Sequence, residues 1–347
     1  MHSLTVSQTK EFVRHVAGRH RHPVMLWGSF GVGKSELMAQ LARENADDML
    51  VDIRLSQYDS VDLRGFPDVD ATTGLTVWHA PSTLPVVGNA AFEQVEGNIW
   101  LFFDEANAAT PAVSAVAYQI TNDRRCGEHI LLPNVIIVLA GNRESDKGVV
   151  NRQPLPLSNR LTHVEVVVSV DDFCKYHAAK GDLPPIAIAF YQFRKELLHT
   201  YDPAKPAKCV STPRTATKAW TYWMDDDMPS AIKMAAMAGA IGEGPAMEAM
   251  AFADTWASLK DYMPRIYKDP DNVELPSKSE LGLRYAVTMA LSGDMSVKTV
   301  NVIHRFLTRL DPEFVIMAWQ FATARDPKLF STPEFIQVGK RYKAVFV

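Results

Sequence analysis

Residues 28–35 read Gly-Ser-Phe-Gly-Val-Gly-Lys-Ser, and this stretch decides the fold. It fits the pattern G-x-x-x-x-G-K-[ST] of phosphate-binding loops. Glycines let the backbone curl around a phosphate chain, and the N-terminus of the following helix adds positive potential. An apolar run at residues 23–27 precedes the loop, and Leu37 and Leu41 give the next stretch a helical apolar face. A strand, a loop and a helix in this order are the context that distinguishes a nucleotide site from a glycine-rich turn.

The loop residues are assigned to ATP and Mg²⁺. Lys34 supplies a point charge for the β- and γ-phosphates, and the Ser35 hydroxyl is a ligand for Mg²⁺. Backbone N–H groups of the loop and of the first helical turn are expected to surround the phosphates. The candidate nucleotide-binding residues are therefore Gly28, Ser29, Phe30, Gly31, Val32, Gly33, Lys34, Ser35 and Glu36.

Two carboxylates, Asp104 and Glu105, directly follow the apolar run at residues 98–103. Carboxylates at the end of a buried strand are costly unless they have a function. Given the phosphate loop upstream, we expect Asp104 to hold Mg²⁺ through water and Glu105 to polarise the attacking water. The structural alternative is a helix that begins with acidic residues in its first turn.

A polar residue ends the next apolar run, and an arginine precedes the last one. Asn142 follows residues 134–140 and is placed to orient the water or the γ-phosphate. Arg160 stands just before residues 163–170, where a guanidinium suits an arginine finger, a group often supplied by a neighbouring subunit. Taken alone, Arg160 would be read as a surface arginine. Other candidates for the same role are Arg124, Arg125, Arg143 and Arg152.

The apolar runs of the first half alternate with helical patterns, which predicts an α/β architecture. Continuous Val, Ile, Leu and Phe runs are typical of strands buried on both faces of a parallel sheet. We therefore predict a three-layer α/β sandwich with strands at residues 23–27, 49–55, 98–103, 134–140 and 163–170.

After residue 170 the pattern becomes helical. Prolines stand near the start of several expected helices, as is typical of the first helical turn. The expected helices cover residues 184–200, 212–224, 229–242, 245–263, 281–293 and 296–310, and residues 269–279 read as a linker. The predicted domains are a P-loop core at 1–170, a helical lid at 171–270 and a helical extension at 271–347.

Composition restricts the classes of partner. The chain has 347 residues, 47% of them apolar and 22% charged, as in soluble globular proteins. A net charge of −4 disfavours nucleic acid and anionic membranes as partners. There is no apolar run of ~18 residues, and the N-terminus lacks the apolar h-region of a signal peptide. Three widely spaced cysteines argue against a disulfide framework. We expect a cytoplasmic protein without membrane association.

The order of these motifs resembles that of AAA+ ATPases and, among them, of the MoxR group and its dynein-related cousins. The resemblance is clearest over roughly residues 20–225. It implies that Asn142 is the family's sensor 1, that Arg160 is its arginine finger, and that Arg214 is the sensor 2 arginine that reaches back to the γ-phosphate. Asn107 is in register with the family's motif after the Asp-Glu pair. The chain departs from the family by Thr212 in the Ser-Pro-Arg signature and by Leu161 after the finger position.

The resemblance also implies partners. Proteins of this kind form rings, usually hexamers, with ATP bound between subunits. MoxR-type ATPases typically act, in a chaperone-like way, with a partner that carries a von Willebrand factor A-like domain. The expected activity is therefore Mg²⁺-dependent ATP hydrolysis that remodels or activates another protein.

An aspartate-rich segment follows the second predicted strand. Its stretch at residues 68–79 faintly resembles a calcium loop, but glycine comes one place late and His79 replaces the final glutamate, so we reject calcium. Residues 59–85 resemble instead the helix-2 insert of MoxR-type ATPases, which projects towards the central pore. Val69 and residues 76–78 are predicted to form its two short strands around Gly74. An ordinary surface hairpin is the alternative.

Two other functions compete with that of a partner-directed ATPase. A nucleic-acid motor or loader with the same fold would use the basic residues near residues 14–22. A small-molecule kinase would need the phosphate loop alone and would leave Asn142, Arg160 and Arg214 unexplained.

Overall fold

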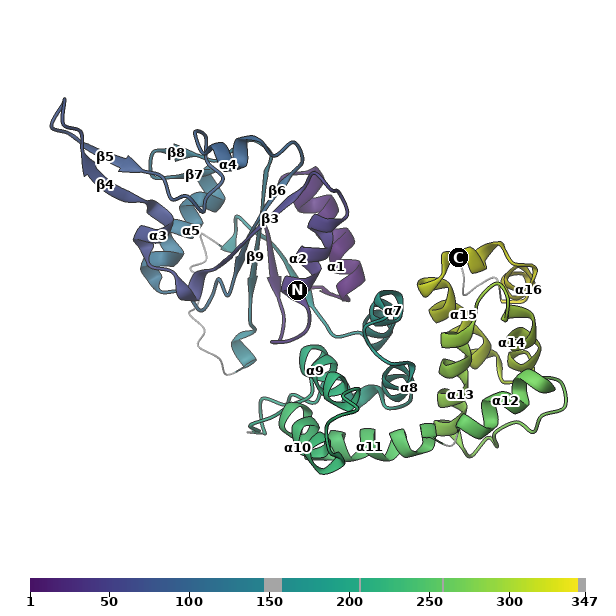
Figure 1. Ribbon diagram of the computed structural model, residues 1–347. Helices are drawn as coiled ribbons and strands as arrows, with labels where there is room; N and C mark the ends of the chain where they lie inside the picture. The colour runs from purple at the N-terminus through teal and green to yellow at the C-terminus, as the bar shows by residue number, and fades with distance from the viewer. Residues whose placement is uncertain (147–157, 206, 258, 343–347) are drawn as a thin grey trace. The chain divides into compact units, whose positions relative to one another are not determined.

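The computed structural model describes residues 1–146, 158–205, 207–257 and 259–342. It divides into two compact units, Met1–Val168 and Ser169–Val347 (Figure 1). Arg152 lies outside the described residues.

A parallel six-stranded sheet forms the centre of the first unit. Its strands have the order β1-β10-β2-β9-β6-β3, and every neighbouring pair is parallel. They are β1 (Ser3–Leu4), β2 (Val24–Trp27), β3 (Met49–Arg54), β6 (Ile99–Asp104), β9 (Val135–Gly141) and β10 (Thr162–Val166).

Helices cover both faces of this sheet (Figure 1). Side chains alternate along β6: Trp100 and Phe102 join one apolar cluster, whereas Leu101 and Phe103 join the other. The first cluster is completed by α1 (Val6–Val13), the π-helical turn Arg14–Arg19 and α2 (Lys34–Arg43), and the second by α3 (Ser60–Arg64) and α5 (Pro111–Asp123). The predicted three-layer α/β arrangement is thus confirmed.

Two small hairpins accompany the sheet. In the first, β4 (Phe66–Val69) and β5 (Thr76–His79) pair antiparallel, with Val69 opposite Thr76 and Gly74 at a φ of 68° in the turn. The predicted hairpin is confirmed, and it projects away from the body of the first unit (Figure 1). The second hairpin, β7 (Arg125–Cys126) with β8 (His129–Ile130), was not predicted. The shorter elements are the 3-10 turns Leu55–Gln57 and Glu144–Asp146 and the helix α4 (Ala90–Glu93).

The described part of the second unit is helical. Within it α8 packs against α13, and α15 packs against both α7 and α13. Its helices are α7 (Val170–Lys180), α8 (Pro185–Phe193), α9 (Pro213–Trp223), α10 (Ser230–Ile241), α11 (Glu243–Ala257), α12 (Leu259–Lys268), α13 (Leu281–Asp294), α14 (Val300–Leu307), α15 (Pro312–Arg325) and α16 (Pro333–Arg341), with 3-10 turns at Lys195–Leu197 and Pro327–Ser331. Among the described residues, no helix combines the length and apolar character that a membrane crossing needs.

Some predicted boundaries were wrong. The last strand ends at Val166 rather than residue 170, because Ser169 caps α7 through its hydroxyl. The helix expected over residues 184–200 ends at Phe193, since Arg194 leaves the helical region with a φ of −122° and a ψ of 68°. The helix expected over residues 245–263 falls within α11 and α12, which stand on either side of residue 258, a position outside the described residues.

Candidate nucleotide site

The phosphate loop lies between the end of β2 and the start of α2. Gly33 is the N-cap of α2 and has a φ of 107°, a left-handed conformation that glycine adopts without the steric cost of a Cβ atom. Val32 is buried, whereas Phe30 is exposed, and Glu36 in the first turn pairs with Arg43 at 3.6 Å. The structure therefore contains the predicted glycine-rich loop, followed directly by the N-terminus of α2.

The Lys34 ammonium is held inside this loop. Its Nζ donates hydrogen bonds to the carbonyl oxygens of Gly28 at 2.7 Å and Ser29 at 3.0 Å. It also donates to Oδ1 of Asn142, at 3.3 Å. The Ser29 hydroxyl is buried and has no hydrogen-bond partner among the described residues, although buried hydroxyls are normally bonded. A buried cation and an unsatisfied hydroxyl in one loop fit an anionic ligand such as a phosphate chain.

Ser35 and Asp104 meet at the carboxyl end of the sheet. The Ser35 hydroxyl donates to Oδ2 of Asp104 at 2.7 Å, and the Glu105 backbone N–H donates to Oδ1 at 2.8 Å. A hydroxyl and a carboxylate are oxygen ligands of the kind that Mg²⁺ prefers. Partial burial and then the charge of Asp104 raise the pKa of the nearby Asp52 carboxyl. The donor set therefore fits a magnesium ion.

Glu105 has an unusual backbone conformation. Its φ is 54°, and residues other than glycine rarely adopt this region outside functional or strongly constrained positions. Its carboxylate Oε2 accepts a hydrogen bond from the Ser56 hydroxyl, in the turn directly after β3. Ser56 was not predicted as a site residue. The sequence could have indicated it, because this hydroxyl comes just after β3, the strand that pairs with β6.

Asn107 fixes the backbone at Asn142. Its side-chain Nδ2 donates to the Asn142 carbonyl at 2.7 Å, and its Oδ1 accepts the Asn142 backbone N–H at 3.1 Å. Asn107 is 2% exposed, so this pair of bonds is shielded from water. The two hydrogen bonds from Asn107 orient Asn142, whose side chain contacts Lys34.

Gly141 leaves the space that the Asn107 side chain needs to form these two hydrogen bonds. A Cβ atom there would lie 2.6 Å from Oδ1 of Asn107 and 2.7 Å from Cε of Met25. Gly141→Ala is expected to cost about 1–3 kcal/mol of stability and to displace Asn107. Urea unfolding would measure this cost. Gly239→Ala is the control, because nothing lies within 4 Å of the added Cβ and alanine favours a helix. Equal stability of the two variants would contradict this account.

The candidate arginines differ in their surroundings. Arg160 is exposed two residues before β10, and no described side chain pairs with it. Arg124 donates to the carbonyls of Leu132 and Val135, both at 3.0 Å, and Arg143 forms a 2.8 Å ion pair with Glu165. Arg124 and Arg143 are engaged within the first unit, whereas Arg125 is exposed, like Arg160, with one long bond of 3.5 Å to the Glu128 carbonyl. Arg160, which the resemblance favours, therefore stays the first candidate for a group that acts on a neighbouring molecule, with Arg125 as the alternative.

Arg214 belongs to the second unit. It is exposed in the first turn of α9, whose N-cap Thr212 forms a capping box with Thr215. The predicted helix start is confirmed. The approach of Arg214 to the phosphate loop stays a prediction.

No protein-family model and no curated protein sequence matches this chain. Among solved structures, NtrX from Brucella abortus aligns over 99% of this chain and 69% of its own, with 13% identity and a TM-score of 0.41. A RuvB mutant from Thermotoga maritima aligns over 88% and 85%, with 17% identity and a TM-score of 0.39. Hsp104 with ATPγS and casein aligns over 71% and 45%, with 18% identity and a TM-score of 0.36. Likenesses this loose assign no function, which must follow from the site itself.

Proposed function

We propose that this chain is a Mg²⁺-dependent AAA+ ATPase of the MoxR type. One observation carries the proposal: the Ser35 hydroxyl bonds to Asp104 while Lys34 contacts Asn142, all at the same edge of the sheet. The strand that ends before Asn142 lies between the phosphate-loop strand and the Asp104 strand. Asp104 and Asn142, at the ends of neighbouring strands, thus both contact residues of the phosphate loop, which supports one phosphate site.

Each residue has a role in ATP hydrolysis under this proposal. Lys34 binds the β- and γ-phosphates, and Ser35 with Asp104 would hold Mg²⁺, which neutralises phosphate charge when bound. Glu105 accepts the proton of the attacking water. Asn142 orients that water or the γ-phosphate. The sensor 2 role of Arg214 completes the proposed site.

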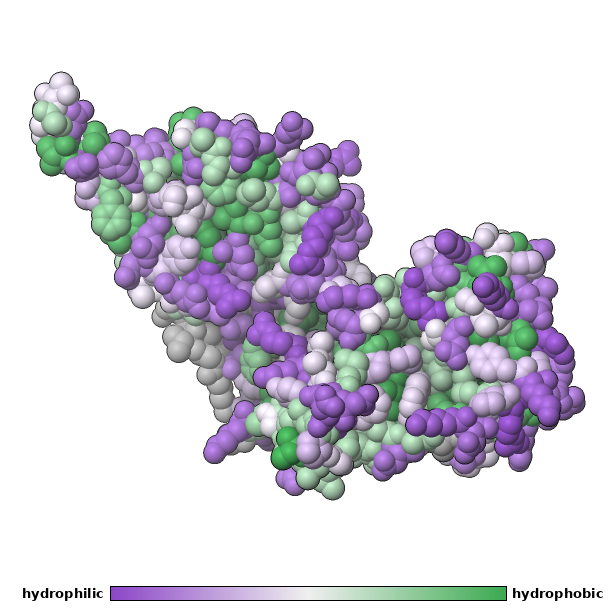
Figure 2. Space-filling view, viewed as in Figure 1, coloured by the Kyte–Doolittle hydropathy of each residue, from purple (hydrophilic) through white to green (hydrophobic). Residues whose placement is uncertain are grey.

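A ring with a protein partner is the finer part of the proposal. The exposed Arg160 suits a site completed by the next subunit of a hexamer. The β4–β5 hairpin exposes Phe66, Val69 and Leu75 by 65%, 65% and 68%, and Figure 2 shows apolar surface there in green. Exposed apolar side chains on a projecting hairpin suit contact with another protein, such as a cytoplasmic client or a partner with a von Willebrand factor A-like domain.

Lys34→Ala tests the phosphate site. Removing the ammonium is expected to weaken ATP binding at least about tenfold and to abolish phosphate release, because the buried point charge is lost. Binding of a fluorescent ATP analogue and phosphate release measure the two effects, with and without Mg²⁺. Lys233→Ala is the control, since that lysine lies in the second unit and donates to the Trp223 carbonyl. Unchanged binding by Lys34→Ala would refute the nucleotide site.

Replacing residues 69–78 by a short Gly-Ser turn tests the hairpin. We expect ATP binding to stay unchanged, because the hairpin forms its own two-stranded sheet apart from the six-stranded one. Partner-dependent activity should be lost. Binding of ATP and stimulation of hydrolysis by a purified partner are the measurements, and undiminished stimulation would contradict the proposed role.

Among the described residues, no observation favours a nucleic-acid motor. Arg21, within the basic N-terminal stretch, donates to Oδ1 of Asn98 at 2.9 Å and to the Asn134 carbonyl. It therefore holds the residues that directly precede β6 and β9. Salt-sensitive binding of DNA or RNA would revive that alternative.

A further inference from the structure

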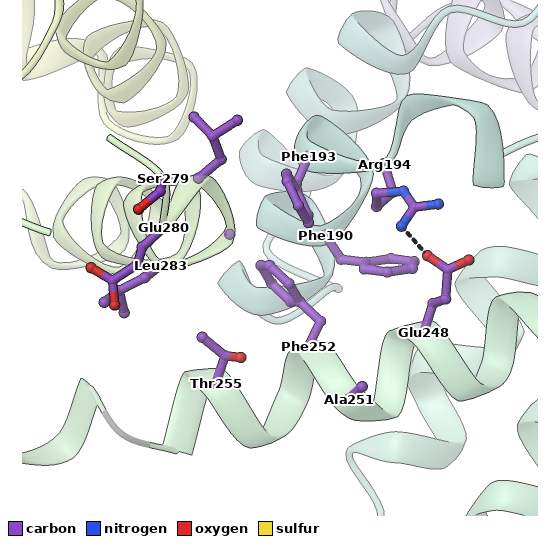
Figure 3. Close-up of a pocket in the computed structure, with 12 residues that line it drawn as sticks. Phe190, Phe193, Arg194, Glu248, Ala251, Phe252, Thr255, Ser279, Glu280 and Leu283 are labelled. Carbon is purple, nitrogen blue, oxygen red and sulfur yellow. Dashed lines mark ion pairs between the residues drawn. The ribbon is translucent and has the colours of Figure 1, made fainter. Parts of the chain in front are cut away.

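A groove in the second unit lies between α8, α11 and α13 (Figure 3). Its volume is 720 Å³, within the range of roughly 300–1,000 Å³ that is common for ligand sites. It is open to solvent on one side. The ATPase proposal uses none of its lining residues.

Aromatic rings form the floor of the α8–α11–α13 groove. The rings of Phe193 and Phe252 stack with centroids 5.9 Å apart, and Phe190 lies 5.7 Å from Phe252. Figure 3 shows the three rings gathered between the helices. Leu281 at the start of α13 is 46% exposed. This floor offers apolar contact to an entering side chain.

Gly282 keeps the groove open above two of these rings. It lies in the first turn of α13, and an added Cβ would meet Phe193 and Phe252 at 3.6 Å, an ordinary contact distance. Neither backbone strain nor a clash requires glycine here. A side chain larger than alanine at this position would lie over the two rings and narrow the groove.

The rim of the groove carries excess negative charge. Arg194 is already paired with two carboxylates, those of Glu196 and Glu248. Glu280 at the opposite end accepts the backbone N–H of Ser277 at 2.9 Å and has no cationic partner among the described residues. An apolar floor between acidic groups complements a ligand that is apolar with a positive charge beside it.

We propose that the α8–α11–α13 groove binds a segment of a partner protein that inserts an apolar side chain and sets a lysine or arginine against the acidic rim. Grooves flanked by helices recognise protein segments in this manner, with apolar anchors for affinity and charges for orientation. The inference goes beyond ATP hydrolysis and does not depend on it.

Selection from a random 12-residue peptide library displayed on phage tests this inference with the full chain. The enriched peptides are expected to combine one or two large apolar residues with Lys or Arg. Synthetic copies should bind the wild type in fluorescence anisotropy, and Gly282→Leu should weaken binding at least about tenfold by filling the groove. Glu280→Gln keeps an acceptor for Ser277 and should weaken binding about threefold, with a flatter salt dependence.

Gly339→Leu is the matched control, because Gly339 lies in α16 and no atom of the described residues is within 4 Å of an added Cβ. It should bind the peptides like the wild type, and thermal unfolding should show both leucine variants folded. Failure to enrich any peptide, an acidic consensus, or equal binding by Gly282→Leu would overturn the inference. A consensus that matches a stretch of this chain would make a second copy the occupant and overturn the assignment to a separate partner.

Discussion

Glu105→Gln is expected to lower ATP hydrolysis at least about 100-fold while ATP binding stays within about twofold of the wild type. An amide cannot accept the proton of the attacking water. It has nearly the same size as the carboxylate, and its oxygen can still accept the Ser56 hydroxyl, so the local structure should persist. Phosphate release and binding of a fluorescent ATP analogue measure the two quantities.

The positive φ of Glu105 makes this result informative. Both Glu and Gln pay the same backbone cost at 54°, so the substitution changes the chemistry and leaves the strain as it was. Glu96→Gln, an exposed site in the same unit, is the control and should hydrolyse ATP normally. A loss of less than about tenfold in Glu105→Gln would exclude this carboxylate as the base.

The strand ends of the site could be predicted from the sequence because apolar runs and their polar termini are local patterns. Asp104 and Asn142 each follow such a run, and a parallel sheet brings these ends to one edge. The meeting of Ser35 with Asp104 follows from this topology once the phosphate loop is placed beside it.

Other contacts between side chains distant in sequence could not be predicted from the residues themselves. Asn107 stood in register with a family motif, but its two bonds to Asn142 depend on the absent Cβ of Gly141. Ser56 reaches Glu105 only because β3 and β6 pair in one register. Apolar periodicity also missed the helix end at Phe193, which depends on the backbone of Arg194.

Arg160→Ala is expected to lower ATP hydrolysis about 10³-fold, the size of effect typical of an arginine finger, with ATP binding by the isolated subunit unchanged. The reason is that the exposed guanidinium would stabilise transition-state charge in the neighbouring site and touch no nucleotide of its own subunit. Arg19→Ala is the control: that arginine is also exposed in the first unit, and it is not among the candidate finger residues.

Mixing variants decides whether Arg160 acts on a neighbour. A Glu105→Gln subunit is inactive but keeps Arg160, whereas an Arg160→Ala subunit keeps its own phosphate loop and Glu105. Mixed assemblies of the two should therefore regain part of the wild-type phosphate release, since each Arg160→Ala site beside a Glu105→Gln subunit becomes complete.

If the mixture stays as inactive as its components while still assembling with ATP and Mg²⁺, Arg160 serves its own subunit or none. If neither variant nor the wild type assembles, the ring itself is refuted, and the exposed arginine would then be an ordinary surface residue.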